Sequence, residues 1–229
     1  MAEDIAHPFS SVEALRFGWA KTFANLRPLL IIGAVGAFFA LLEQAFSVPG
    51  EERALRALLL IIVRVLQVAL TLVYVRVALK LHDGEPVDVW RPGALLADFF
   101  PFLLVYVLYA LIVGVGIALL IVPGVIWGLK FGFAGFALVD KKLDPIEALR
   151  ASSRLTDGVK TQLLAFALLM IGVNILGAIA FGIGLLVTIP TTCIAGAYVL
   201  RRLQARAEQR TRTAAQIPPL SAPPAAATP

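Results

Sequence analysis

The sequence has few of the residues that most enzymes use for chemistry. Its 229 residues include two histidines, His7 and His82, and one cysteine, Cys193. The histidines are far apart, and no H-E-x-x-H motif, nucleophile–base–acid set or P-loop accompanies them. A lone cysteine cannot form an internal disulfide or complete a Cys/His zinc motif. We therefore predict a protein that is not an enzyme, with no catalytic residue, no cofactor and no metal site.

Charge is also scarce. Charged residues make up 15% of the chain and hydrophobic residues 59%, whereas a soluble domain carries about 25% charged residues. Several apolar runs reach the roughly 20 residues that an α-helix needs to cross a hydrocarbon core about 30 Å thick. The composition therefore predicts an integral membrane protein.

The net charge of +5 comes from 20 lysines and arginines against 15 acids. Most of these basic residues lie in segments that would share one side of the membrane. Cytoplasmic loops carry such an excess of lysine and arginine. The basic balance therefore indicates orientation, with both termini in the cytoplasm, and we predict no nucleic-acid partner.

Three short segments repeat one pattern: a polar cap, a small residue or proline, an aliphatic residue, an acid, two apolar residues and an arginine. They are residues 10–16, 85–91 and 144–150. Each precedes an apolar run, a turn with an aliphatic residue before proline, and a second apolar run. The turns are Val48-Pro49-Gly50, Val122-Pro123-Gly124 and Ile189-Pro190-Thr191. A recurring unit of this size indicates one supersecondary module used three times.

The fold that we predict is an all-α membrane bundle of six transmembrane helices in three parallel repeats. Each repeat is an amphipathic interfacial helix followed by a transmembrane hairpin. The spans are expected at about 28–46, 53–81, 98–121, 123–139, 162–187 and from 190 onward. The membrane domain covers 1–207, with repeats at about 10–81, 85–140 and 144–207. Residues 208–229, rich in proline and alanine, are expected to form a disordered cytoplasmic tail.

The interfacial helices carry their own start and stop signals. Ser10 and Glu13 fit a capping box that opens a helix over about 11–26. Asp144 suits an N-cap with Pro145 at the first helical position, and Gly158 suits the C′ position. Pro92-Gly93 should end the middle copy early, so that helix is expected to be short or broken.

From Val122 onward the residues resemble a large family of bacterial multi-pass membrane proteins. The motif is Pro123-Gly124 at the start of a span, then Ala148-Leu149-x-x-Ser152-x-x-Leu155-Thr156-x-Gly158 before the next. It resembles YciC-like proteins and the membrane domain of some glycerophosphodiester phosphodiesterases. The clear match covers about 120–170, and weaker copies extend it over most of 10–203. An aromatic residue is commoner at the position of Ser153, and a polar one at that of Val159.

The resemblance implies a six-helix protein of the bacterial inner membrane whose biochemical role is mostly unassigned. Where that family has phosphodiesterase activity, a separate soluble domain carries it.

Polar residues inside the predicted spans are the main indication of a site, because such residues are rare in a bilayer. Arg64, Gln67, Lys130 and Asn174 are candidates for binding a lipid phosphate or another anion. The alternative is structural: Glu43 and Arg64 form an intramembrane ion pair, with Arg56 as a competing partner, and Lys130 extends toward the membrane surface.

A stripe of glycines lies on the fourth predicted span at Gly124, Gly128 and Gly132. Small residues at this spacing let two membrane helices approach closely. The stripe fits packing within the chain, or alternatively contact with a second copy or another membrane protein.

These features favour an accessory or membrane-organising protein whose partners are membrane lipids, including anionic ones. The alternative is a transporter or lipid-handling permease that uses a polar mid-membrane cavity. A third hypothesis is the membrane subunit of a lipid enzyme whose catalytic chain is separate.

Overall fold

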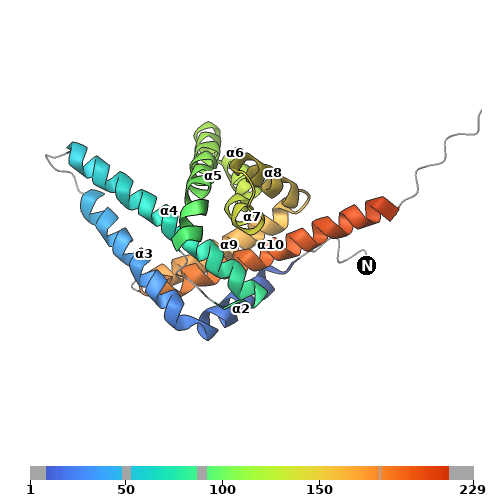
Figure 1. Cartoon of the computed structure of the whole chain (residues 1–229), viewed down its shortest axis with the longest axis horizontal. Helices are drawn as coiled ribbons and strands as arrows, with labels where there is room; N and C mark the ends of the chain where they lie inside the picture. Colours follow the sequence, from blue (N-terminus) through green and yellow to red (C-terminus); the bar gives the residue numbers. More distant parts are fainter. Residues whose placement is uncertain (1–8, 48–52, 87–91, 181, 217–229) are drawn as a thin grey trace, which may run out of the picture.

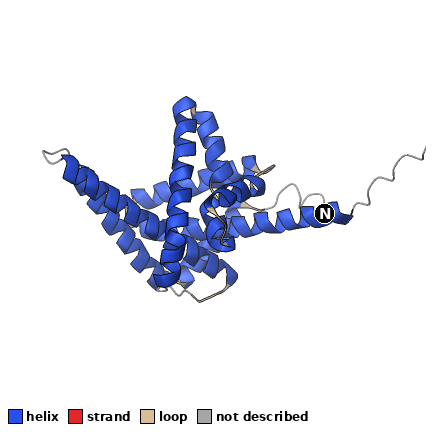
Figure 2. Cartoon of the chain, turned by 45° about the horizontal axis from the view of Figure 1, so that its top comes forward, coloured by secondary structure: helices blue, strands red, loops and turns tan. Residues whose placement is uncertain are grey.

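The computed structural model describes residues 9–47, 53–86, 92–180 and 182–216, and these residues form helices and loops without a strand (Figures 1 and 2). The helices, in chain order, are α2 (Ser11–Ala24), α3 (Leu26–Ser47), α4 (Arg53–Asp83), α5 (Pro92–Leu119), α6 (Ile121–Phe131), α7 (Ala134–Lys141), α8 (Pro145–Leu155), α9 (Lys160–Ile179) and α10 (Leu185–Gln216). The predicted all-helical class is confirmed.

Within the part of the chain that the structure describes, five segments are long and apolar enough to cross a membrane. They are Leu26–Ser47, Arg53–Asp83, Leu95–Leu119, Ile121–Lys141 and Lys160–Ile179. This finding agrees with a multi-pass membrane protein. The sixth predicted span falls in the first half of α10, which is not among the five because its apolar residues run directly into a basic half.

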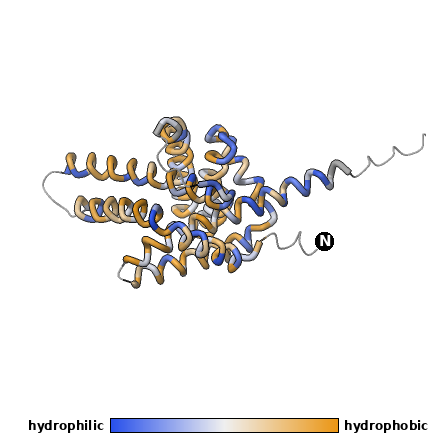
Figure 3. Tube along the Cα trace, turned by 60° about the horizontal axis from the view of Figure 1, so that its bottom comes forward, coloured by the Kyte–Doolittle hydropathy of each residue, from blue (hydrophilic) through white to orange (hydrophobic). Residues whose placement is uncertain are grey.

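Two helical hairpins leave the body of the molecule in different directions (Figure 1). In one, α3 packs on α4; in the other, α5 packs on α6. Both hairpins consist mostly of apolar residues (Figure 3), and Phe38, Leu41, Ile61, Phe100 and Leu111 are each more than half exposed. Such surface suits contact with lipid better than contact with water.

The core lies around α10, which packs against α2, α3, α4 and α9. The buried residues of α10 include Ile194, Ala195, Ala197, Val199, Leu200 and Leu203. The second half of the helix is largely hydrophilic (Figure 3), and its far end extends away from the body (Figure 1).

The position of the third hairpin turn differs from the prediction. The turn expected at Ile189-Pro190-Thr191 is wrong, because α10 runs through Pro190. The chain instead reverses between α9 and α10, where Gly182 has a φ of 74°. Glycine adopts this left-handed conformation without strain, and Pro190 is only the sixth residue of α10. The turn expected at Val48-Pro49-Gly50 lies outside the described residues.

In the second hairpin the reversal comes at Leu120, whose backbone is extended. Pro123 lies inside the first turn of α6, as a residue without an N–H donor can.

The Ser10 half of the predicted capping box is confirmed, since Ser10 Oγ accepts a hydrogen bond from the Glu13 N–H at 3.4 Å, whereas the Glu13 carboxylate lies 3.8 Å from Arg202 Nη2. In α8, Pro145 opens the helix after Asp144, as predicted. The C-cap is Thr156, so Asp157 occupies the C′ position and Gly158, predicted there, lies one residue further on.

The middle interfacial helix cannot be compared, because residues 87–91 lie outside the described part. Pro92 and Gly93, expected to end that helix, instead open α5. Proline is well suited to a first helical turn because its missing N–H would have no partner there.

The C-terminal boundary also differs from the prediction. A disordered tail is predicted from residue 208, but α10 continues to Gln216. The reason is local: residues 205–216 are mostly alanine, arginine, glutamine and glutamate, which favour helix, and the first proline of the tail is Pro218.

Helix α2 binds α10 through a face of small residues. Ala14 and Thr22 are completely buried, and Gly18 lies between them on the same face. A Cβ at Gly18 would lie 2.4 Å from the Thr191 carbonyl oxygen. The two helices therefore touch through their backbones. On the outer side of α2, Val12, Trp19 and Phe23 are exposed, which fits the predicted position at a membrane surface.

The contact predicts an effect of Gly18→Ala. The added methyl group would clash with backbone that cannot move aside, so we expect a loss of about 1–3 kcal/mol in the free energy of unfolding, typical of overpacking. Thermal unfolding in detergent measures it. Gly172→Ala is the matched control, since nothing lies within 4 Å of its Cβ position. Equal stabilities of the two variants would contradict the contact.

Candidate functional site

The fourth predicted span is interrupted near its middle. We predict one continuous helix over 123–139, but α6 ends at Phe131 and α7 begins at Ala134. Ser152 of α8 fills the gap: its Oγ accepts a hydrogen bond from the Phe133 N–H at 3.2 Å and donates one to the Lys130 carbonyl at 2.8 Å. The Thr156 hydroxyl lies 3.2 Å from the same carbonyl. These hydroxyls satisfy backbone groups that the break leaves without helical partners.

Ser152 and Thr156 belong to the motif that suggested the family resemblance, and both are completely buried. Their contacts give the motif a physical reason: α8 supplies hydroxyls at the level where the span is broken. Ala148, one turn earlier, is also completely buried and keeps that face of α8 narrow.

Two of the three glycines pack within the chain. A Cβ at Gly124 would lie 2.7 Å from the Ile117 nitrogen on α5. Gly128 faces Tyr109, whose hydroxyl donates to the Gly128 carbonyl at 3.4 Å. The sequence leaves open whether these glycines pack within the chain or against a second copy or another membrane protein. The contacts match packing within the second hairpin.

The third glycine, Gly132, is predicted to pack on another helix but does not. It lies at the break, where a Cβ would come 2.8 Å from the Gly128 carbonyl. The sequence pattern suggests one stripe of three because it assumes an unbroken helix.

Glu43 and Arg64 form an ion pair between α3 and α4. Gln67 completes the group: its amide donates to Glu43 Oε2 at 3.0 Å, and its Oε1 accepts from Arg64 Nη1 at 3.4 Å. The Arg64 side chain is 64% exposed and that of Glu43 25%. The acid thus already engages both residues that were candidates for binding an anion on α4.

Lys130 has a different environment. Its ammonium lies 5.3 Å from the centre of the Phe131 ring. The side chain also lines an apolar groove of about 460 Å³ with Trp127 of α6 and with Leu111 and Val115 of α5.

Asn174 faces α10 from α9. Its amide nitrogen donates to the Met170 carbonyl at 3.0 Å and lies 3.5 Å from Thr192 Oγ1. The four predicted anion-binding residues, Arg64, Gln67, Lys130 and Asn174, therefore occupy three separate environments and do not form one site. Each lies in a predicted span, but the sequence cannot tell which faces of different spans meet.

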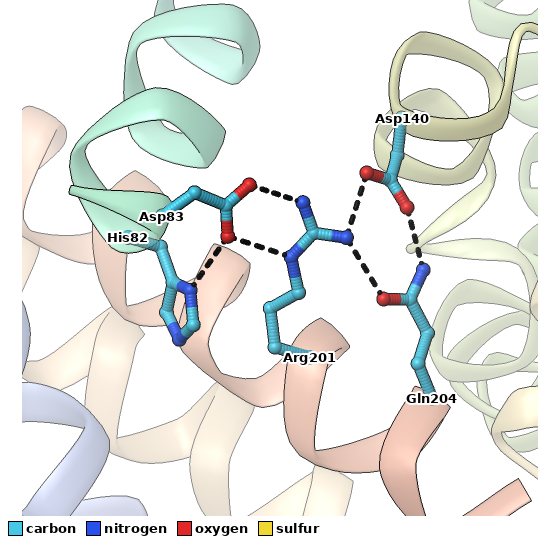
Figure 4. A network of polar contacts seen from close by, with 5 residues as sticks. All are labelled: His82, Asp83, Asp140, Arg201 and Gln204. Atoms are coloured by element: carbon cyan, nitrogen blue, oxygen red, sulfur yellow. Dashed lines mark hydrogen bonds and ion pairs between the residues drawn. The ribbon is translucent and has the colours of Figure 1, made fainter. Parts of the chain in front are cut away.

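A polar network that we did not predict joins three helices at Arg201 of α10 (Figure 4). The guanidinium binds Asp83 at the end of α4, with Nε 3.1 Å from Oδ1, and Asp140 of α7, with Nη1 2.7 Å from Oδ1. Gln204 accepts from Arg201 at 3.0 Å and donates to Asp140 Oδ2 at 2.7 Å. His82 contacts Asp83 Oδ1 at 3.1 Å.

A second cluster lies on Asp98 of α5. Its carboxylate accepts from Arg76 of α4 and from Lys142 at the end of α7. The Asp98 side chain is 12% exposed. Together the Arg201 network and the Asp98 cluster connect α4, α5, α7 and α10 by charge-assisted hydrogen bonds, which are stronger than neutral ones.

Sequence reasoning missed both groups because it assigned Arg201 and Lys142 to membrane orientation. One signal was available: Asp83, Asp98 and Asp140 each lie at the end of a predicted span that faces the predicted cytoplasmic side, and Asp83 and Asp140 have basic neighbours in the sequence. Among residues 9–47, 53–86, 92–180 and 182–216, no group of three or more His, Cys, Asp or Glu side chains is arranged to hold a metal.

No protein-family model, curated protein or solved structure matches this chain. The resemblance to YciC-like proteins therefore stays a prediction.

The break in the span yields a test at Ser152. Ser152→Ala would leave the buried Phe133 N–H without a hydrogen-bond partner and would remove one of the donors to the Lys130 carbonyl. We therefore expect a loss of about 1–3 kcal/mol in the free energy of unfolding. Ser153→Ala is the matched control, because the Ser153 hydroxyl forms no hydrogen bond within the described residues. Thermal unfolding in detergent, with limited proteolysis around Gly132, compares them. Unchanged stability of Ser152→Ala would contradict the assigned contacts.

The Arg201 network yields a second mutational test. Arg201→Gln should leave two carboxylates without their cation and cost about 2 kcal/mol. Adding Asp140→Asn should cost less in the Arg201→Gln background than alone, because the residues are coupled. Arg212→Gln, which removes an exposed arginine of the same helix, should have little effect. Additive losses in the double variant would rule out the coupling.

Proposed function

We propose that the chain is a six-span protein of the bacterial inner membrane, built as three parallel repeats with both termini in the cytoplasm. In this proposal it does no catalysis and acts as an accessory or membrane-organising component that binds anionic lipid. The apolar half of α10 is the sixth span.

The repeat is supported by two buried stripes with equal spacing. On α2 and on α8, three small residues recur every fourth position, at the same offset in the repeat pattern. They are Ala14, Gly18 and Thr22, and Ala148, Ser152 and Thr156. Each stripe packs against the second half of another hairpin: α2 on α10, and α8 on α6 and α7. Such an arrangement is expected if each interfacial helix docks on a neighbouring repeat.

Lipid binding is supported above all by the distribution of exposed charge. The hairpins present mostly apolar side chains outward, whereas one group of exposed basic residues lies on α8, at the start of α9 and on the second half of α10. Its members are Arg150, Arg154, Lys160, Arg210 and Arg212. Further exposed basic residues lie on α2, α3 and α4 and at the end of α7. Near an anionic membrane surface each such residue contributes about 1 kcal/mol of attraction.

An accessory role is favoured over transport because the polar residues of the predicted spans lie in separate environments. A transport pathway needs polar groups that follow one another through the bilayer. Here Arg64 and Gln67 engage Glu43, Lys130 lies in an apolar groove, and Asn174 faces Thr192. The stronger charge clusters connect helices to one another, which supports a structural use of charge.

The proposed orientation predicts which cysteines can be labelled from each side. In a Cys193→Ala background, a cysteine at Lys142 should react with a membrane-impermeant maleimide only after the cells are opened. A cysteine at Ile183, in the exposed turn between α9 and α10, should react in cells whose outer membrane alone is permeabilised. The reverse pattern would overturn the topology.

The lipid proposal is tested in nanodiscs that contain phosphatidylglycerol and phosphatidylcholine in equal amounts. Analysis of the lipids that remain after mild delipidation should show a several-fold enrichment of phosphatidylglycerol over the starting mixture. A membrane protein with a comparable number of spans and no basic cluster is the control. Equal retention of both lipids would contradict anionic-lipid binding.

A further inference from the structure

Two arginines of α10 converge on the turn between α8 and α9, apart from both charge clusters described above. Arg206 and Arg210 lie one helical turn apart and extend toward Gly158. Their Nη2 atoms are 3.9 and 3.7 Å from the position that a Gly158 Cβ would occupy. Two cations are thus brought close together over one small patch of backbone.

The Arg206 guanidinium is partly buried, and no acid in the described part of the chain forms an ion pair with it. Its Nε and Nη1 atoms are buried and have no hydrogen-bond partner among the described residues. Burial, and then the charge of Arg210, lowers the pKa of Arg206 below its ordinary value. Burying a cation without a partner is costly, and a neighbouring cation adds repulsion. An anion at this position would remove both penalties.

The surrounding backbone adds positive potential. Helix α9 begins just after Gly158, with Lys160 as its first residue and no acid in its first turn. A helix N-terminus usually carries acids, because its unpaired N–H groups favour negative charge. Asp157 is the acid next to Gly158 along the chain, and it is exposed to solvent.

We infer that Arg206 and Arg210 bind a phosphate group over Gly158, and that this phosphate belongs to an anionic lipid headgroup. The inference rests on the proposed function and names the site of its lipid. Helix α9 is long and apolar enough to span a membrane from Lys160 onward, so Gly158 lies where that span begins. Lipid phosphates lie at this depth. Guanidinium groups recognise phosphate oxygens through paired N–H donors.

Removing the two charges is the direct test. In nanodiscs of phosphatidylglycerol and phosphatidylcholine, Arg206→Gln/Arg210→Gln should bind retained phosphatidylglycerol about tenfold more weakly, as expected when charge-assisted hydrogen bonds are lost. Arg16→Gln/Arg27→Gln is the matched control: it removes two exposed arginines near α2 and should change the retention by less than about threefold. An equal loss in both variants would mean general surface attraction and would overturn the site.

A second test places an anion in the site without removing any arginine. Gly158 has a φ of 73°, a conformation that aspartate and asparagine tolerate better than other side chains. A Cβ there would make ordinary contacts with both guanidiniums. Gly158→Asp should therefore displace the lipid phosphate, whereas Gly158→Asn, of the same size and neutral, should retain most of it. Equal binding by the two variants would contradict the site.

Inorganic phosphate separates a lipid source from a soluble one. If the lipid headgroup is the ligand, 10 mM phosphate should not raise the unfolding temperature of delipidated protein in detergent. A rise that is lost in Arg206→Gln/Arg210→Gln would show a soluble phosphate ligand and overturn the lipid assignment.

The failures of the two proposals are distinguishable. If the wild-type chain enriches phosphatidylglycerol and all these variants do so equally, the Gly158 site is wrong and the proposed function stands. If the wild-type chain shows no enrichment and no effect of phosphate, both are wrong.

Discussion

The arrangement of the hairpins depends on Arg201, whose guanidinium binds both Asp83 and Asp140. These carboxylates come from α4 and α7, so one side chain on α10 fixes the ends of two different hairpins. The Asp98 cluster does the same for α4, α5 and the end of α7. Apolar helices in lipid have little hydrophobic reason to stay together. Ion pairs at one end of the helices, together with close backbone contacts such as Gly18 against Thr191, supply the association energy that the hydrophobic effect does not supply in lipid.

The broken fourth span follows the same logic. A membrane helix can be interrupted only where other groups satisfy its backbone. Ser152 and Thr156 do this from outside the span, which makes α8 part of the structure of α6 and α7 rather than a passive surface element. The hydroxyl residues of the motif therefore need no catalytic role to account for them.

The sequence predicts that five of the spans exist, because long apolar runs leave few alternatives to a membrane helix. It does not predict the break in the fourth span, and it ends the fifth at residue 187 rather than at Ile179. It also predicts the Ser10 cap and the start of α8 at Pro145, since capping depends on neighbouring residues only. It misplaces the third turn, because a proline six residues into a helix reads as a breaker whereas Gly182 and Gly184 give no clear boundary. It cannot predict that Lys130 and Asn174 lie apart from Arg64, because this depends on how helices rotate against one another. Glu43 and Arg64 are the exception: they belong to consecutive helices, so their meeting can be expected from depth alone.

The length and continuity of α10 have a mechanical consequence. One uninterrupted helix extends from the hairpin turn beside Leu185 to Gln216, about 48 Å at 1.5 Å per residue. Its first half is clamped between other helices, whereas its far end stands clear of the body (Figure 1). Because the helix is continuous, a force applied to that far end would be transmitted along it to Arg201. From Arg201 the force would reach α4 and α7 through the ion pairs with Asp83 and Asp140.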